Sequence, residues 1–233
     1  MFSSPTHVLS TYVMSKSPYD PIADFTAVAR VGETPNLIIM SKQMPQTTLK
    51  EVADDARINP SRWTAATAAL GSPGHLAMVS FSNLTKANLT ITPYRGTAPA
   101  LNDVAGGHVQ LLTDGIQVLL PQVRGGQVKA LAVTTAKRTP HAPDIPTAAE
   151  NGMPELEFTS WYGIWAPKGL SADILAKLNA AIAQAGKEAT ESGKFSALGV
   201  EAVAEAPDAF LQFTQVYAKQ SAGILKAANF KPE

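Results

Sequence analysis

The 233-residue sequence contains no cysteine, so disulfides, thiolate metal ligands and a cysteine nucleophile are excluded. It also lacks an excess of either charge, with 19 basic and 19 acidic residues. No basic surface is therefore predicted that could neutralise nucleic-acid phosphates, and no nucleic-acid partner is expected. No apolar run approaches the about 20 residues that a membrane-spanning helix needs.

The first residues, Met1 to His7, have neither a basic segment nor an apolar one and do not resemble a secretory signal. The signal of an exported protein would have to lie outside this sequence. Hydrophobic residues make up 45% of the chain and charged residues 16%, which is typical of a globular protein.

The central part of the sequence alternates between short apolar runs and amphipathic segments. Gly106-Gly107 and Gly125-Gly126 stand where a helix ends in a left-handed residue, and a strand is predicted directly after each pair. Such repeated units predict right-handed crossovers and a mainly parallel sheet, which is an α/β fold. The predicted strands cover residues 37–40, 63–68, 89–92, 110–113 and 129–135, and the predicted helices cover residues 49–57, 75–84 and 98–105.

The last part of the sequence changes character. Residues 136–154 are rich in proline and polar side chains and predict a connecting stretch, whereas residues 158–166 predict an aromatic strand. Ser171 is predicted to cap a helix, and a final helix is predicted to begin near Pro207. The apolar stripe of the first of these helices consists of Ile174, Leu175, Leu178, Ile182 and Ala185.

Two strand-like segments, 36–40 and 162–166, bracket the central α/β block. They predict a chain that leaves one lobe, builds a second and returns. Lobe 1 would consist of residues 1–40 and 160–233, and lobe 2 of residues 41–159. Two lobes joined by paired crossovers would form a hinged cleft.

Catalytic motifs are not found. Ser72, His75 and Asp114 have the residue types of a nucleophilic triad. However, Pro73 follows the serine and has no N–H group to offer an oxyanion, so a serine hydrolase is the weakest alternative. The four histidines lack metal-ligand spacing, and no glycine-rich nucleotide motif occurs. The sequence predicts no catalytic residue, metal or cofactor, and hence a protein that is not an enzyme.

An anion-binding turn is the strongest chemical signal. The segment from Thr67 to Ser72 follows a predicted strand and opens a predicted helix. Unpaired N–H groups and the helix dipole favour negative charge at such a place. Small residues let a ligand approach, and the hydroxyls of Thr67 and Ser72 add donors. The alternative interpretation is that Ser72 only caps its helix.

Three further positions leave two interpretations open. Asp114 follows a buried strand, where α/β sheets place ligand groups, but it could also cap the helix that starts at Ile116. Arg95 stands at a strand-to-helix junction and either contacts an anion or lies on the surface. Trp161 lies near the predicted crossover and belongs either to the core or to a ligand-binding wall.

Short motifs follow one another along the whole sequence. They are Ser4-x-x-His7, Pro18-Tyr19-Asp20-Pro21-x-x-Asp24-Phe25, Gly71-Ser72-x-x-His75-Leu76, Pro93-Tyr94-Arg95-Gly96-x-x-Pro99-Ala100, Gly106-Gly107-x-Val109, Leu131-Ala132-Val133-Thr134, Pro143-Asp144-Ile145-Pro146-Thr147 and Trp161-Tyr162-Gly163. Each is weak singly, but in this order they resemble the Bug family, the substrate-binding proteins of tripartite tricarboxylate transporters.

The resemblance implies a two-lobed periplasmic binding protein of type II, a Venus flytrap. Such a protein would capture a small organic carboxylate in the periplasm for membrane transporter subunits, gripping it through loop backbones and bridging waters. The ligand-binding residues implied by similarity are Ser4, Thr6 and His7 in the first lobe, Thr67, Ala69, Gly71, Ser72, His75 and Asp114 in the second, and Trp161.

The sequence departs from the family pattern in two ways. The family usually has glycine where Ala69 stands and an aromatic residue where Thr113 stands, so the pocket is expected to differ in shape. Family members also begin with an opening β-α-β-α portion that carries a Pro-x-x-x-Gly-Gly ligand loop, and this sequence shows none. The first lobe is therefore expected to be incomplete, through truncation or in a member that completes it by self-association.

Two alternatives of other classes remain. A truncated or degenerate member could act as a protein-interaction module that binds no ligand. An effector-sensing domain of a transcription regulator would share the two-lobed fold, but nothing in the sequence resembles a helix-turn-helix.

Overall fold

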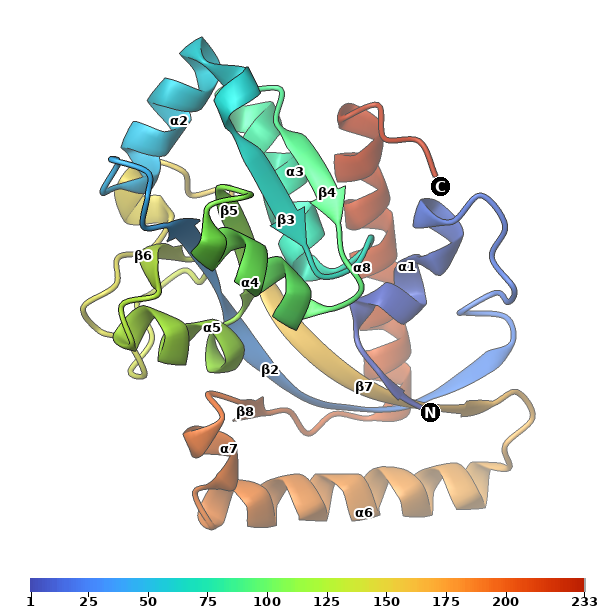
Figure 1. The fold of residues 1–233 in the computed structure, drawn as a ribbon. Coiled ribbons are helices and arrows are strands. Elements are labelled where there is room, and N and C mark those ends of the chain that lie inside the picture. Colours follow the sequence, from blue (N-terminus) through green and yellow to red (C-terminus); the bar gives the residue numbers. More distant parts are fainter. Residues whose placement is uncertain (233) are drawn as a thin grey trace. The chain divides into compact units, whose positions relative to one another are not determined.

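The computed structural model describes residues 1–232 and divides the chain into two compact units (Figure 1). Unit 1 consists of Met1–Thr34 and Trp161–Glu233, and unit 2 consists of Pro35–Ser160. The chain passes from one unit to the other inside two long strands, β2 (Phe25–Ser41) and β7 (Thr159–Pro167). The first crossing comes earlier than the predicted boundary at residue 40. That the units act as the two lobes of a ligand clamp stays a prediction.

Unit 2 has a mixed sheet. The strands β5 (Leu111–Gly115), β3 (Thr64–Thr67) and β4 (Thr90–Pro93) are parallel and adjacent in that order. The second half of β2 lies between β5 and β6 (Val128–Val133) and is antiparallel to both. The α/β class is confirmed. The prediction of a mainly parallel sheet is wrong for β2, which runs antiparallel to both of its neighbours. This strand enters from unit 1 and not through a βαβ crossover, so its direction is not set by the crossover rule.

Helices cover this sheet around two apolar cores. The helices α2 (Leu49–Ile58) and α3 (Pro73–Thr85) belong to the core that contains Trp63 and Phe81. The helices α4 (Thr97–Gly106) and α5 (Ile116–Arg124) contribute to a second core. Its buried residues include Leu37, Ile39, Val104, Leu112 and Leu119.

The central elements match the sequence pattern closely. All predicted helices and all predicted strands after β2 are present, with ends that differ by no more than two residues. The helix α2 begins at a capping box, in which Thr48 and Glu51 satisfy each other's main-chain N–H groups. Glycine in the left-handed region ends α4 at Gly107 (φ 81°), as predicted.

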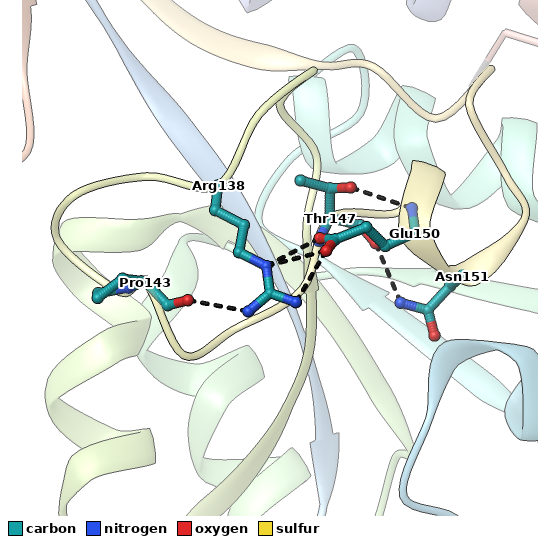
Figure 2. A network of polar contacts seen from close by, with 5 residues as sticks. All are labelled: Arg138, Pro143, Thr147, Glu150 and Asn151. Atoms are coloured by element: carbon teal, nitrogen blue, oxygen red, sulfur yellow. Dashed lines mark hydrogen bonds and ion pairs between the residues drawn. The ribbon is translucent and has the colours of Figure 1, made fainter.

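The stretch predicted to connect unit 2 back to unit 1 has little regular structure, only the 3-10 turn η2 (Ala149–Asn151). A backbone bridge between Val133 and Thr147 ties it to β6, and side chains hold it as well (Figure 2). Arg138 donates to the Glu150 carboxylate at 2.8–3.0 Å and to the carbonyl oxygen of Pro143 at 3.0 Å. Glu150 also accepts from the N–H of Thr147 at 2.7 Å, and Thr147 accepts from the N–H of Glu150 at 3.1 Å. The carboxylate thus joins both ends of the stretch.

We expect Arg138→Gln to raise the pKa of Glu150 from its present value of about 2 towards the ordinary range. The largest cause of the lowering is the hydrogen bond from Arg138, followed by the one from the Thr147 backbone. The second bond survives the substitution, so the pKa should stay below that of a free glutamate. An NMR pH titration of the Glu150 carboxyl measures it. Arg124→Gln is the matched control because Arg124 pairs with Asp144 and not with Glu150. An equal rise of the Glu150 pKa in the Arg124→Gln variant would contradict the prediction.

Unit 1 is built on a smaller sheet. The strand β1 (Phe2–Ser3) pairs antiparallel with β7, which is followed by the first half of β2. The short strand β8 (Glu201–Ala202) pairs antiparallel with β2. The helix α1 (Pro5–Val13) packs against α8 (Pro207–Ala227), which begins where predicted. The core of this unit is rich in aromatic rings, namely Trp161, Trp165, Phe210, Phe213 and Tyr217.

Helix α6 (Ala172–Glu191) and the short helix α7 (Lys194–Ala197) complete unit 1. Ser171 is the N-cap of α6, as predicted, but its side chain accepts no capping bond from the first turn, which the structure describes in full. Of the α6 residues, all of them described, only Gly186 is buried. The predicted apolar stripe is therefore not enclosed by its own unit.

Within residues 1–232, no helix is long and apolar enough to cross a membrane.

Candidate functional site

The strands β3, β4 and β5 end at the same edge of unit 2, since they are parallel neighbours. Each is followed by a helix: α3 after β3, α4 after β4 and α5 after β5. Three helix N-termini therefore gather at this edge, which is where α/β sheets bind ligands. We call it the carboxyl edge of unit 2. It brings together the predicted residues between Thr67 and His75 and the predicted Asp114.

The turn from β3 to α3 is closed by its own hydrogen bonds. The hydroxyl of Thr67 bonds the hydroxyl of Ser72 at 3.1 Å and donates to the carbonyl oxygen of Ala69 at 3.1 Å. Ser72 accepts from the N–H of His75 at 3.1 Å, so the interpretation of Ser72 as a helix cap is confirmed. Gly71 has a φ of 76°, a conformation that disfavours a side chain. Ligand contacts of these residues stay a prediction.

His75 lies under this turn and is neutral at physiological pH. Its side chain is 1% exposed, and burial lowers its pKa to about 4. The ring atom Nδ1 accepts from the N–H of Gly71 at 3.2 Å, which requires that nitrogen to be unprotonated. His75 therefore shapes the turn and supplies no positive charge to an anion.

Gly74 is a residue of this site that the sequence motifs did not single out for its role. A Cβ atom at position 74 would lie 1.9 Å from the carbonyl oxygen of Thr113 in β5. The first turn of α3 thus approaches the β5 backbone more closely than any side chain permits. The close approach involves a residue far away in sequence, so only the structure reveals it.

Asp114 is fixed at the carboxyl edge by two bonds. One carboxylate oxygen accepts from the N–H of Gly115 at 2.8 Å, and the other accepts from the hydroxyl of Thr97 at 2.5 Å. The helix α5 begins at Ile116 as expected, but its N-cap is Gly115 and Asp114 does not cap it. Thr97, at the start of α4, was missed by sequence reasoning. The half-exposed Asp114 offers the edge an acceptor beside the helix N–H donors.

The residues predicted for the first lobe lie at the start of α1. Ser4 is the N-cap of α1 without a capping bond to the described first turn, and its hydroxyl bonds that of Thr6 at 2.9 Å. Both are half-buried and stay candidates on unit 1.

His7, the third of these residues, is 2% exposed and packs on the rings of Tyr19, Phe25 and Trp165 with centroids 4.7–5.1 Å away. Its ring nitrogens have no hydrogen-bond partner among residues 1–232. Burial, followed by the charge of the N-terminus, lowers its pKa to about 4. The ring is thus a neutral member of an aromatic cluster.

Trp161 and Arg95 differ in exposure. Trp161 is 1% exposed and meets Phe210, Phe213 and Tyr217 edge to face with centroids 5.1–6.0 Å away, which places it in the core of unit 1. Its ligand role stays a prediction. Arg95 is exposed just before α4. Over residues 1–232, no group of three or more histidine, aspartate or glutamate side chains could hold a metal ion.

Comparisons with known proteins agree along the whole chain. Residues 1–230 match the family described as tripartite tricarboxylate transporter family receptor. BugT of Bordetella pertussis is 29% identical over 98% of this chain and 70% of its own length. A UPF0065 protein of Agrobacterium vitis is 32% identical over 80% of this chain. The alignment spans only 54% of that relative, so the chain is shorter than the proteins it matches.

Solved structures show the same fold. An R. palustris protein with adipate has a TM-score of 0.92 and 32% identity, covering 100% of this chain and 78% of its own. The periplasmic binding protein BugD has a TM-score of 0.89 and 30% identity, with coverage of 100% and 78%. MatC from Rhodopseudomonas palustris with bound malate has a TM-score of 0.86 and 31% identity, with coverage of 96% and 78%.

Proposed function

Because the chain belongs to the tripartite tricarboxylate transporter receptor family, we propose that it is a periplasmic solute-binding protein that captures a small carboxylate for a transporter of that class. The observation that carries the proposal is the carboxyl edge of unit 2, where α3, α4 and α5 all begin. Helix N-termini at one edge of a sheet stabilise an anion through main-chain N–H groups and need no cationic side chain.

The chemistry of this edge suits a carboxylate that also carries a hydrogen-bond donor. The turn between Thr67 and Ser72 opens α3, with the N–H groups of Gly71 and Ser72 bonded inside the turn, and Asp114 presents an acceptor held by Thr97 and Gly115. Asp114 repels a second carboxylate that approaches it closely but accepts from a hydroxyl group. The relatives with adipate and with malate bind small carboxylates without and with such a hydroxyl.

The family is one of solute-binding receptors and not a class of enzymes. The geometry agrees with this, because the residue types of a nucleophilic triad have other partners here. Ser72 caps α3 and bonds Thr67, and His75 accepts from the Gly71 backbone. Pro73, directly after Ser72, has no N–H group to stabilise an oxyanion.

Thermal unfolding against a panel of carboxylates tests the proposal. A ligand at about 100 times its dissociation constant should stabilise the fold by about 2.7 kcal/mol, a rise in Tm of roughly 5–10 °C for a chain of this size. The panel includes malate and adipate, with their neutral diamides as controls for the charge. No shift with any carboxylate would overturn the proposal and favour a protein-interaction module that binds no ligand.

We expect Thr67→Val to weaken ligand binding by up to about thirtyfold, since it removes two hydrogen bonds worth about 1 kcal/mol each from the turn. The side chain is fully buried, and valine fills the same space. Thr85→Val is the matched control, because the Thr85 hydroxyl bonds the Phe81 carbonyl at the far end of the same helix. Calorimetric titration measures both variants. Equal losses of affinity would show that the turn is not the contact.

A further inference from the structure

Arg95 is the one arginine without an acidic partner among residues 1–232. The other five arginines of the chain each pair with a carboxylate, namely Arg30, Arg57, Arg62, Arg124 and Arg138. Arg95 is exposed and forms no ion pair with any described residue. A guanidinium is always charged and presents a planar fork of N–H donors that matches a carboxylate. This fork is available to a ligand.

The backbone holds Arg95 beside the turn that opens α3. The N–H of Tyr94 donates to the carbonyl oxygen of Thr67 at 2.8 Å. The N–H of Gly96 donates to the carbonyl oxygen of Ala68 at 2.9 Å. Arg95 stands between these two bonds, so its main chain runs beside the turn at about the 4.8 Å spacing of paired strands. Arg95 is therefore a residue of the carboxyl edge of unit 2.

The acidic residues of the adjoining elements are bonded to other groups. The Asp103 carboxylate of α4 accepts from the hydroxyl of Tyr94 at 2.6 Å. The Asp114 carboxylate of β5 accepts from the hydroxyl of Thr97 at 2.5 Å. Neither carboxylate forms an ion pair with Arg95, so both leave its positive charge uncompensated.

The start of α4, directly after Arg95, is open. Its N-cap is Gly96, which offers no side-chain cap to the described first turn. A Cβ atom at position 96 would have no described atom within 4 Å apart from its chain neighbours. The dipole of α4 favours negative charge at this end. The guanidinium and the helix N-terminus therefore favour the same kind of ligand group, an anion.

On the basis of the proposed function, we propose that Arg95 is a specificity-determining residue that binds the second carboxylate of a dicarboxylate. The first carboxylate lies at the start of α3, after β3, and the second lies at the end of the neighbouring strand β4. Asp114 belongs to β5, which is on the other side of β3. The second carboxylate thus approaches the cation on one side of the turn and avoids the carboxylate on the other. A monocarboxylate leaves Arg95 unused.

Calorimetric titration with matched pairs of acids tests this role. Malate is compared with 2-hydroxybutyrate, and adipate with hexanoate, because a methyl group replaces one carboxylate in each pair. We expect the parent chain to bind at least one dicarboxylate about tenfold more tightly than its monocarboxylate, as for a hydrogen bond to a charged group. Arg95→Gln should remove this preference by weakening the binding of the dicarboxylate. Because Arg95 is exposed, the preference should also shrink as salt is added.

Two further variants separate the charge from its position and geometry. Lys86→Gln is the matched control, because Lys86 is an exposed cation at the opposite end of α3 and the substitution removes the same charge. It should leave the preference for dicarboxylates intact. Arg95→Lys keeps the charge but not the planar fork, so it should retain only part of the preference. A circular dichroism spectrum identical to that of the parent chain shows that each variant is folded.

The outcomes distinguish this role from the proposed function. Equal affinities within both pairs of acids would overturn the role of Arg95 but leave carboxylate binding in place. Equal losses for the dicarboxylate and the monocarboxylate in Arg95→Gln would make Arg95 a structural residue of the turn and would also overturn its specificity role. Binding of none of the four acids, nor of any other carboxylate, would overturn the proposed function and the role of Arg95 with it.

Discussion

Gly74→Ala should lower the free energy of unfolding by about 3 kcal/mol, at the upper end of the range for overpacking. The added Cβ atom would lie 1.9 Å from the carbonyl oxygen of Thr113, and a main-chain atom within a sheet cannot yield as a flexible side chain can. The first turn of α3 must therefore move away from β5. Because that turn is part of the carboxyl edge, we expect ligand binding to weaken as well.

Gly223→Ala in α8 is the matched control for this substitution. A Cβ atom at position 223 has no described atom within 4 Å outside its own helix, so alanine should stabilise the helix by about 0.5–1 kcal/mol. Urea unfolding measures both variants, and an unchanged m value shows that stability alone has changed. Equal effects at the two positions would contradict the close approach of α3 to β5.

Acid should destabilise both units between about pH 6.5 and pH 4, because His7 in unit 1 and His75 in unit 2 take up protons there in the unfolded chain but not in the folded one. Both pKa values are lowered from 6.5 to about 4 in the folded state, mainly by burial. Above pH 6.5 both imidazoles are neutral in the folded and in the unfolded chain, so they add nothing to the pH dependence of stability. Below it the unfolded chain binds protons that the folded chain does not, so stability falls until pH 4. The loss approaches about 3 kcal/mol for each histidine.

Substitution separates the two histidines. His7→Phe keeps an aromatic ring among Tyr19, Phe25 and Trp165 and should remove the contribution of unit 1 to the acid loss. His75→Gln should remove that of unit 2. Unfolding in urea at pH 7.5 and pH 4.5 gives the difference for each variant. The pKa values of the Asp144 and Glu150 carboxyls are lowered from 3.8 and 4.5 to about 2. Their contribution to stability is therefore lost only as the pH falls below those ordinary values. If the free energy of unfolding fell between pH 7.5 and pH 4.5 by as much in both variants as in the parent chain, the burial of these two rings would be contradicted.

Some features followed from the sequence because they depend on residues close together along the chain. Apolar periodicity located the helices and strands of unit 2, and Thr48 with Glu51 determined where α2 begins. The glycine pairs ended their helices with one residue in the left-handed region, at Gly107 (φ 81°) and Gly126 (φ 67°). Family motifs in order indicated the binding-protein class, which the family match confirms.

Other features depend on contacts between residues distant in sequence, and only the tertiary structure decided them. The placement of β2 between β5 and β6 reversed the expected direction of one strand. The periodicity of α6 revealed an apolar face but not which part of it the unit would cover. The closeness of Gly74 to Thr113 and the bond from Thr97 to Asp114 join separate elements. Local propensity acts within a few turns of chain, whereas burial and close approach depend on how those elements pack.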